Sequence, residues 1–150
     1  MSKKESTAKK AAIIGYITAA ILLFAVVLVI PQSRAVFKSL SGAHPYLMGF
    51  AKFALLATAG ELIAAYIANS APTVPVKIAA RFVIWGFIGV WITFMMKVFS
   101  VAAAQMMASG LLPGGDSSFL RALYTSVMMN TSFGPTFMAV HKCSDKWLEL

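Results

Sequence analysis

The sequence predicts an all-α integral membrane protein, a bundle of four transmembrane helices with both termini in the cytoplasm. Of its 150 residues, 59% are apolar and only 12% are charged, compared with about half and about a quarter in soluble domains. The mean hydropathy is +0.79. A soluble fold of this size cannot hide so much apolar surface in one core. The composition therefore argues against a soluble enzyme, a secreted disulfide scaffold and a disordered chain.

The net charge of +8 would suggest a nucleic-acid-binding protein if the chain were soluble. The basic residues flank apolar runs, however, which is typical of membrane topology and headgroup contact, and no nucleic-acid-binding motif accompanies them. Membrane lipids are thus expected partners, and nucleic acid is not. The single cysteine, Cys143, excludes an internal disulfide and a multi-cysteine metal site. No metal or cofactor is expected.

The four predicted spans cover residues 11–30, 46–69, 78–99 and 120–141 of a single membrane domain, 1–150. The first run holds 20 residues without a charge, which cross about 30 Å of hydrocarbon at about 1.5 Å per residue. A signal peptide is the alternative. Its apolar region usually has about 7 to 15 residues and ends at a small-residue cleavage site, so a retained span is expected.

Prolines separate the first three spans. A polar connection runs from Pro31 to Pro45 and closes at His44, because a proline disfavours helix in the residue before it. Pro72 and Pro75 predict a short hairpin between antiparallel neighbours.

The third apolar run extends from Ile78 to Leu112, which exceeds one bilayer thickness. Residues 102–109 are therefore expected at or beyond the interface. A turn is predicted at 113–118 from its Pro, Gly, Asp and Ser residues, and residues 141–150 form a short amphiphilic tail at the end of the fourth span.

Basic residues are distributed unequally between the two sides of this arrangement. The termini and the second connection carry eight: Lys3, Lys4, Lys9, Lys10, Lys77, Arg81, Lys142 and Lys146. The opposite side carries three: Arg34, Lys38 and Arg121. Because cytoplasmic loops are rich in Lys and Arg, both termini are predicted in the cytoplasm, with the protein in the inner or plasma membrane. Lys52 and Lys97 lie within spans, close enough to the outer interface to extend their ammonium groups into the headgroups.

A candidate polar site lies near the middle of the second and fourth spans. Glu61 is eight residues from Asn69, about 12 Å into the membrane, and antiparallel counting places Gly86 and Phe133 at the same depth. The helical neighbours of Glu61 are all small, so this face is expected to pack on protein: Ala54, Ala57, Thr58, Ala64, Ala65 and Ala68. The fourth span contributes Asn130, Thr131, Ser132, Gly134 and Pro135.

Two interpretations of these residues stay open. An ionisable side chain inside a span is functional by default, but Glu61 can equally be protonated and join its helix to a neighbour. Pro135 leaves the carbonyl of Thr131 without its helical donor, so a break is expected there. Transporters build sites from broken helices that line a wet cavity, whereas a kink satisfied by the Thr131 or Ser132 side chain needs no such role.

Three features lie along the last two-thirds of the chain: the Gly60-Glu61 pair after a Thr/Ala run, Arg81 before the next span, and MNTSFGPTFMAVH, a Gly-Pro followed by a His. In these the chain resembles the family of peroxisomal membrane proteins and their mitochondrial inner-membrane relatives. That family usually has Gly-Asp where Glu61 stands, a shorter gap from Gly-Pro to His, and a carboxy-terminal Trp/Pro and Asn-Phe motif that is missing here. The resemblance implies a shortened, bacterial-type relative that forms small pores or supports organelle homeostasis.

The leading hypothesis is a channel or transporter subunit with a polar site at the membrane midplane. Its rival is a structural or assembly protein whose polar residues only hold helices together. Four helices with so few polar groups cannot enclose a wide pore, so conduction would require a homo-oligomer or a partner membrane protein. An enzyme is not expected. His141, Cys143 and Asp145, for example, are spaced by two residues and point away from their neighbours on a helix.

Overall fold

Helices make up nearly all of the computed structural model, which describes residues 3–69, 74–75 and 77–149. Those ranges contain no strand, so the all-α prediction is confirmed for them. The helices form two compact units, Met1–Val90 and Trp91–Leu150. The single membrane domain expected from the sequence stays a prediction.

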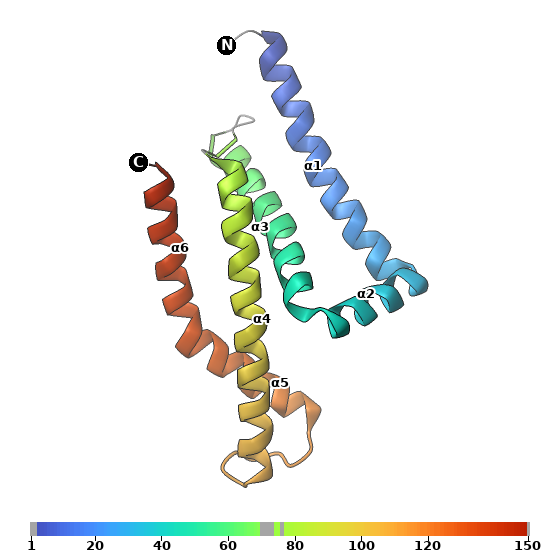
Figure 1. Cartoon of the computed structure of the whole chain (residues 1–150), viewed down its shortest axis with the longest axis vertical. Helices are drawn as coiled ribbons and strands as arrows, with labels where there is room; N and C mark the ends of the chain where they lie inside the picture. The colour runs from blue at the N-terminus through green and yellow to red at the C-terminus, as the bar shows by residue number, and fades with distance from the viewer. Residues whose placement is uncertain (1–2, 70–73, 76, 150) are drawn as a thin grey trace. The chain divides into compact units, whose positions relative to one another are not determined.

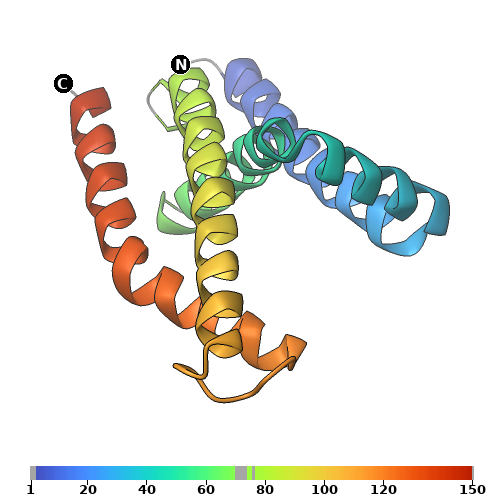
Figure 2. The ribbon, with the colours of Figure 1, turned by 60° about the horizontal axis from the view of Figure 1, so that its bottom comes forward.

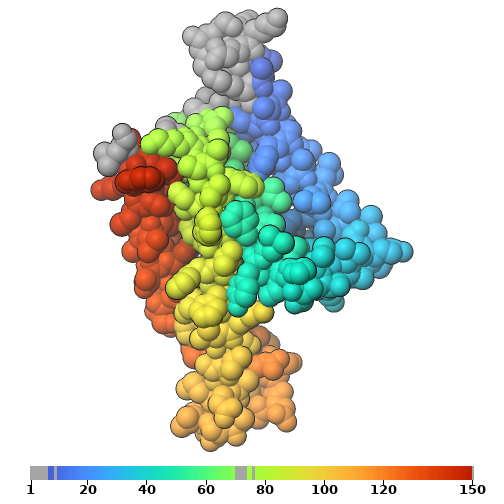
Figure 3. Space-filling view, in the orientation of Figure 1, coloured from blue at the N-terminus to red at the C-terminus, as the bar shows by residue number. Residues whose placement is uncertain are grey.

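Three helices are long and apolar enough to cross a membrane. They are Lys10–Val29 within α1 (Lys3–Val29), α3 (Pro45–Asn69) and α4 (Ile78–Ala108), and they match the first three predicted spans. Apolar side chains are exposed along α1, where Leu28 and Val29 are 64% and 76% exposed. The space-filling view shows this helix along an open face of its unit (Figure 3). These features are compatible with a small membrane protein.

Helix α4 is longer than one crossing requires. Its 31 residues rise about 46 Å, so the predicted crossing at 78–99 and the extension at 102–109 belong to one uninterrupted helix that ends at Ala108. Residues 78–90 of α4 belong to the first unit, and the remainder belongs to the second.

The polar connection between Pro31 and Pro45 is itself a helix, α2 (Pro31–Ala43), a conformation that the sequence analysis did not assign to it. Pro31 occupies the first helical position, where its missing amide hydrogen costs nothing. The chain leaves the helical conformation at His44, as the following proline predicts, and α3 then begins. Helix α2 joins the end of α1 to the start of α3 (Figures 1 and 2).

One cation–π contact fastens α2 to α3. The Lys52 ammonium nitrogen lies 5.3 Å from the centroid of the Phe37 ring. The sequence suggested only that Lys52 extends towards the headgroups. The contact gives Lys52 a packing role as well.

Helix α1 is attached to α3 through a tyrosine. The Tyr16 hydroxyl donates a hydrogen bond of 2.9 Å to the carbonyl oxygen of Leu55. Helix α4 packs on α3 through glycines instead, since Gly86 lies against the ring of Phe50 and Gly89 lies against the backbone of Gly49. Small residues of this kind let helix backbones approach closely.

The small-residue face predicted on α3 is confirmed in its middle and not at its end. Ala54 and Thr58 are 0% and 4% exposed, whereas Ala64 and Ala68 are exposed. The larger side chains of Leu56, Ile63, Tyr66 and Ile67 are exposed. Leu62 is also buried, because α1 and α4 both pack on α3 and bury a wider face than the neighbours of Glu61 alone define.

In the second unit, the predicted turn at 113–118 lies within the loop between α4 and α5 (Ser118–Met128). Three glycines here adopt positive φ, namely Gly110, Gly114 and Gly115, a backbone conformation that other residues rarely tolerate. The Ser117 side chain accepts a hydrogen bond from the Leu120 amide and caps α5.

The fourth predicted span is not one regular helix, which corrects the sequence interpretation of 120–141. It consists of α5, a π-helical turn η1 (Met129–Phe133) and α6 (Gly134–Glu149), which meet at an angle (Figures 1 and 2). Helix α6 also includes most of the expected tail. The predicted hairpin residue Pro72 lies outside the described residues.

Candidate polar site between two apolar helices

Glu61 on α3 meets two side chains of α4 within the first unit. Its Oε1 atom accepts a hydrogen bond of 2.8 Å from the indole Nε1 of Trp85 and lies 3.5 Å from the guanidinium Nη1 of Arg81. The side chains of Arg81 and Glu61 are 9% and 16% exposed. The charge of Glu61 is therefore opposed by a cation and stabilised by a neutral donor in an apolar setting.

Helical spacing explains why these two partners converge on one carboxylate. Arg81 and Trp85 are four residues apart on α4, so their side chains lie on the same face. The antiparallel depth count placed Gly86 opposite Glu61, and Trp85 is the residue directly before Gly86. The predicted depth agrees with the pairing, but the partners themselves were not anticipated.

Arg81 was assigned to the cytoplasmic connection because it stands near the start of the third apolar run. The structure places it in the first turn of α4, from which its long side chain reaches the carboxylate. The spacing of Arg81 and Trp85, together with the antiparallel count, was the signal that could have identified the cluster.

The second carboxylate oxygen of Glu61 has a different environment. Oε2 is buried and has no hydrogen-bond partner among the described residues. An acceptor that loses water without gaining a donor is costly, typically by about 1 to 3 kcal/mol. Chemically, this oxygen offers a position for a proton or a small cation beside an ion pair.

The polar motif of the fourth span surrounds the π-helical turn in the second unit. The amide of Gly134 donates to the carbonyl of Met129, five residues earlier, in place of the usual four. Pro135 has no amide hydrogen and its ring would clash with the Thr131 carbonyl in a regular helix, so a π turn just before it relieves a local conflict. The predicted break is thus present as a wider turn, and the chain there stays helical.

The side chains of this motif bond to their own helix. The side-chain amide of Asn130 donates a hydrogen bond of 2.8 Å to the carbonyl of Ser126, and the Thr131 hydroxyl donates one of 2.8 Å to the carbonyl of Val127. The Ser132 hydroxyl donates to the carbonyl of Met128. All three side chains are exposed. These three bonds reach carbonyls one turn earlier on the same helix, and none of the three is made to the Thr131 carbonyl that Pro135 leaves without its usual donor.

The predicted joint site of Glu61 with residues 130–135 involves both units. Glu61 belongs to the first unit and the π-helical motif to the second, and their association stays a prediction. Elsewhere in the second unit, His141 Nε2 lies 3.5 Å from Asp145 Oδ2, one helical turn away, while Cys143 is exposed.

Comparison of this chain with protein-family models, curated proteins and solved structures found no match. The resemblance to the peroxisomal membrane protein family stays a prediction based on the Gly60-Glu61, Arg81 and Gly134-Pro135 motifs.

Proposed function

We propose that this chain is a small multi-pass membrane protein that crosses the bilayer four times, with both termini in the cytoplasm. Helices α1, α3 and α4 support three of the crossings by length and composition. For the fourth, α5, η1 and α6 follow one another without a gap over residues 118–149, and a helical path of that length exceeds the roughly 30 Å of hydrocarbon. The asymmetry of basic residues supports the orientation.

Within that membrane, the function supported best is that of a structural or assembly subunit. The observation that carries this proposal is the pairing of Glu61 with Arg81 and Trp85, which uses the carboxylate of α3 to join it to α4. Interhelical hydrogen bonds are one of the forces that hold membrane helices together, because lipid provides no hydrophobic drive between them. No catalytic role or cofactor is part of the proposal.

Exposed apolar side chains supply the surface that such a subunit needs. They include Leu28 and Val29 on α1, Ile67 on α3 and Phe87 on α4. In a bilayer these side chains face lipid tails or another protein, and the proposed partners are lipids together with a second copy of the chain or another membrane protein.

A channel or transporter subunit is the second candidate, and one observation favours it. Glu61 Oε2 is buried without a hydrogen-bond partner among the described residues, next to a guanidinium that could be displaced by a transported cation. Intramembrane acids of this kind serve as proton relays in pumps and transporters.

Reconstitution separates the two candidates. The purified chain would be placed in liposomes and assayed for proton, sodium and potassium flux, while Glu61→Gln is compared with the parent protein in flux and unfolding. For an assembly subunit, flux equals that of empty liposomes, and the substitution changes the unfolding free energy alone, by about 3 to 5 kcal/mol, because it leaves the buried Arg81 guanidinium without its anion.

Asp116→Asn is the matched control, because Asp116 is an exposed carboxylate in the loop before α5. A cation flux that Glu61→Gln abolishes and Asp116→Asn preserves, with both variants folded, would establish the transport function and refute the assembly role.

A further inference from the structure

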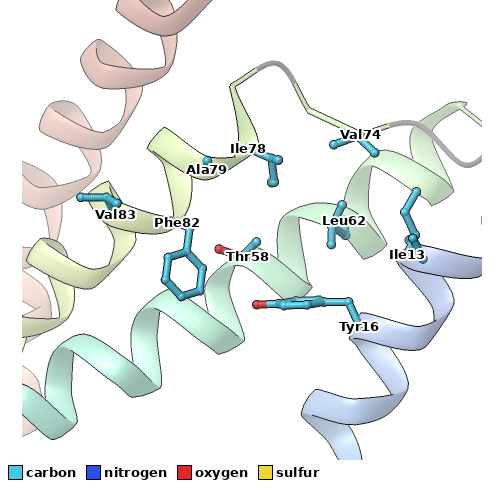
Figure 4. A pocket seen from close by; sticks show the side chains of 10 residues that line it. Ile13, Tyr16, Thr58, Leu62, Val74, Ile78, Ala79, Phe82 and Val83 are labelled. Carbon is cyan, nitrogen blue, oxygen red and sulfur yellow. The ribbon is translucent and has the colours of Figure 1, made fainter. Parts of the chain in front are cut away.

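The first unit contains an open groove of about 510 Å³ between the beginning of α1, the middle of α3 and the beginning of α4. Ten residues line it: Ala12, Ile13, Tyr16, Thr58, Leu62, Val74, Ile78, Ala79, Phe82 and Val83. Its volume falls within the roughly 300 to 1,000 Å³ of small-molecule sites in proteins. Figure 4 shows side chains from all three helices converging on it.

The lining of the groove is apolar except at two hydroxyls. Tyr16 already donates its proton to the Leu55 carbonyl. Thr58 is 4% exposed, and its Oγ1 has no partner in hydrogen-bonding geometry among the described residues. Figure 4 shows the Thr58 hydroxyl beside Phe82 in the groove. A buried hydroxyl without a partner is costly, so an acceptor that entered the groove beside Thr58 would gain a donor there.

Two lysines adjoin the groove along the chain. Lys10 precedes the lining residue Ala12 by two positions near the start of α1, and Lys77 directly precedes the lining residue Ile78 at the start of α4. Both are exposed. The first turn of α4 also opens here, and the amides at a helix N-terminus favour an anionic group such as phosphate.

We infer that this groove binds one anionic glycerophospholipid, with its phosphate at Lys10, Lys77 and the start of α4. The acyl chain lies against the apolar lining, which includes Leu62, Phe82 and Val83. Phe82 stands one turn beyond Ile78, about 6 Å along α4, so Thr58 beside it is placed to donate to an ester carbonyl just below the phosphate. Charge complementarity with the two lysines selects an anionic headgroup over a zwitterionic one.

This inference requires only that the first unit lies in a membrane. It is independent of the choice between assembly and transport, because lipid retention is measured without a flux or an unfolding readout. Failure of one proposal therefore leaves the other in place.

The test is lipid retention by the full-length chain. Delipidated protein in detergent is titrated with phosphatidylglycerol or phosphatidylcholine of identical acyl chains, and native mass spectrometry counts bound lipids per chain. We expect one phosphatidylglycerol per chain, bound about 30-fold more tightly than phosphatidylcholine. This factor corresponds to about 1 kcal/mol for each of the two lysines near the headgroup.

Two variants examine the two ends of the site. Lys10→Gln combined with Lys77→Gln should lower the affinity for phosphatidylglycerol to that for phosphatidylcholine, whereas the matched double variant Lys38→Gln with Lys142→Gln should not. Ala79→Leu should fill the groove and reduce retention of both lipids, whereas Ala19→Leu, on an exposed position of α1, should not.

The helical circular dichroism spectrum of each variant confirms folding. If Ala79→Leu does not fold, Ala12→Leu fills the same groove from an exposed position of α1. Unchanged preference for phosphatidylglycerol in the Lys10/Lys77 variant would overturn the inference. Undiminished binding of both lipids in the filled variant would overturn it as well.

Discussion

The backbone of Gly89 lies directly against the carbonyl oxygen of Gly49, so that a Cβ atom at position 89 would overlap it. The same Cβ would lie 2.5 Å from the Cβ of Phe53, another atom that cannot swing away. This contact sets how closely α4 approaches α3. It lies on the same pair of helices that Glu61, Arg81 and Trp85 join.

Gly89→Ala should therefore destabilise the α3–α4 pair, by about 1 to 3 kcal/mol, as overpacking does elsewhere. Gly86→Ala should cost less, because the atoms that its Cβ meets belong to the ring of Phe50, which can turn. Gly60→Ala is the matched control, since no heavy atom lies within 4 Å of its Cβ position. Unfolding in mixed detergent micelles would rank the three variants, and an equal cost at positions 60 and 89 would contradict the close approach.

Arg81→Gln should destabilise more than Arg81→Gln combined with Glu61→Gln. The single variant leaves a buried carboxylate without its cation, a change that typically costs about 3 to 5 kcal/mol, whereas the double variant leaves two neutral amides that can bond to each other. Unfolding free energies of the parent, both single variants and the double variant provide the comparison. Arg34→Gln, at an exposed position of α2, is the control. Additive effects of the two substitutions would show that the ion pair does not couple the helices.

Lys52→Met and Phe37→Leu should show a coupling of about 0.5 to 1 kcal/mol in a double-mutant cycle, because the ammonium lies over the ring. Amide hydrogen exchange of α2 should accelerate in both single variants. Val36→Ala replaces Phe37→Leu in the control cycle, since Val36 is 59% exposed on the same helix. Coupling of equal size in the control cycle would show that the cation–π contact does not cause the coupling between Lys52 and Phe37.

Cys143 should report the side of the membrane on which α6 ends. It is the single cysteine of the chain and is exposed, so a membrane-impermeant maleimide can label it without other substitutions. With four crossings and a cytoplasmic amino terminus, labelling in intact cells requires permeabilisation. A cysteine introduced at the exposed Gln32 with Cys143 replaced by Ser serves as the external control. Labelling of Cys143 from outside in intact cells would leave three crossings.

Helix α2 illustrates how far sequence patterns extend. Pro31 and the His44-Pro45 pair mark its two ends, and the second of these boundaries was expected. The segment between them is too short and too polar to be recognised as a span. Its apolar residue Phe37 becomes meaningful only when Lys52 of α3 lies opposite.

The π-helical turn is a feature whose position the sequence indicated and whose form only the structure shows. Pro135 predicts a disturbance of the helix from covalent structure alone, since it has no amide hydrogen to donate. Whether the chain unwinds, kinks or widens depends on which carbonyls find other donors. The side chains of Asn130, Thr131 and Ser132 bond to carbonyls of the preceding turn, and this local arrangement is visible only in the structure.

Length and composition by themselves determined that the chain is helical and apolar enough for a membrane, because an apolar run of about 20 residues and a proline boundary act locally. The antiparallel count also predicted that Glu61 lies level with Gly86, next to Trp85, since helical rise converts residue count into distance. Only the tertiary structure decided that Arg81 and Trp85 meet Glu61, and that α1, α3 and α4 leave a groove beside Lys10 and Lys77. Those relationships depend on how each helix is rotated and tilted against its neighbour. No periodicity in a single sequence encodes that rotation or tilt.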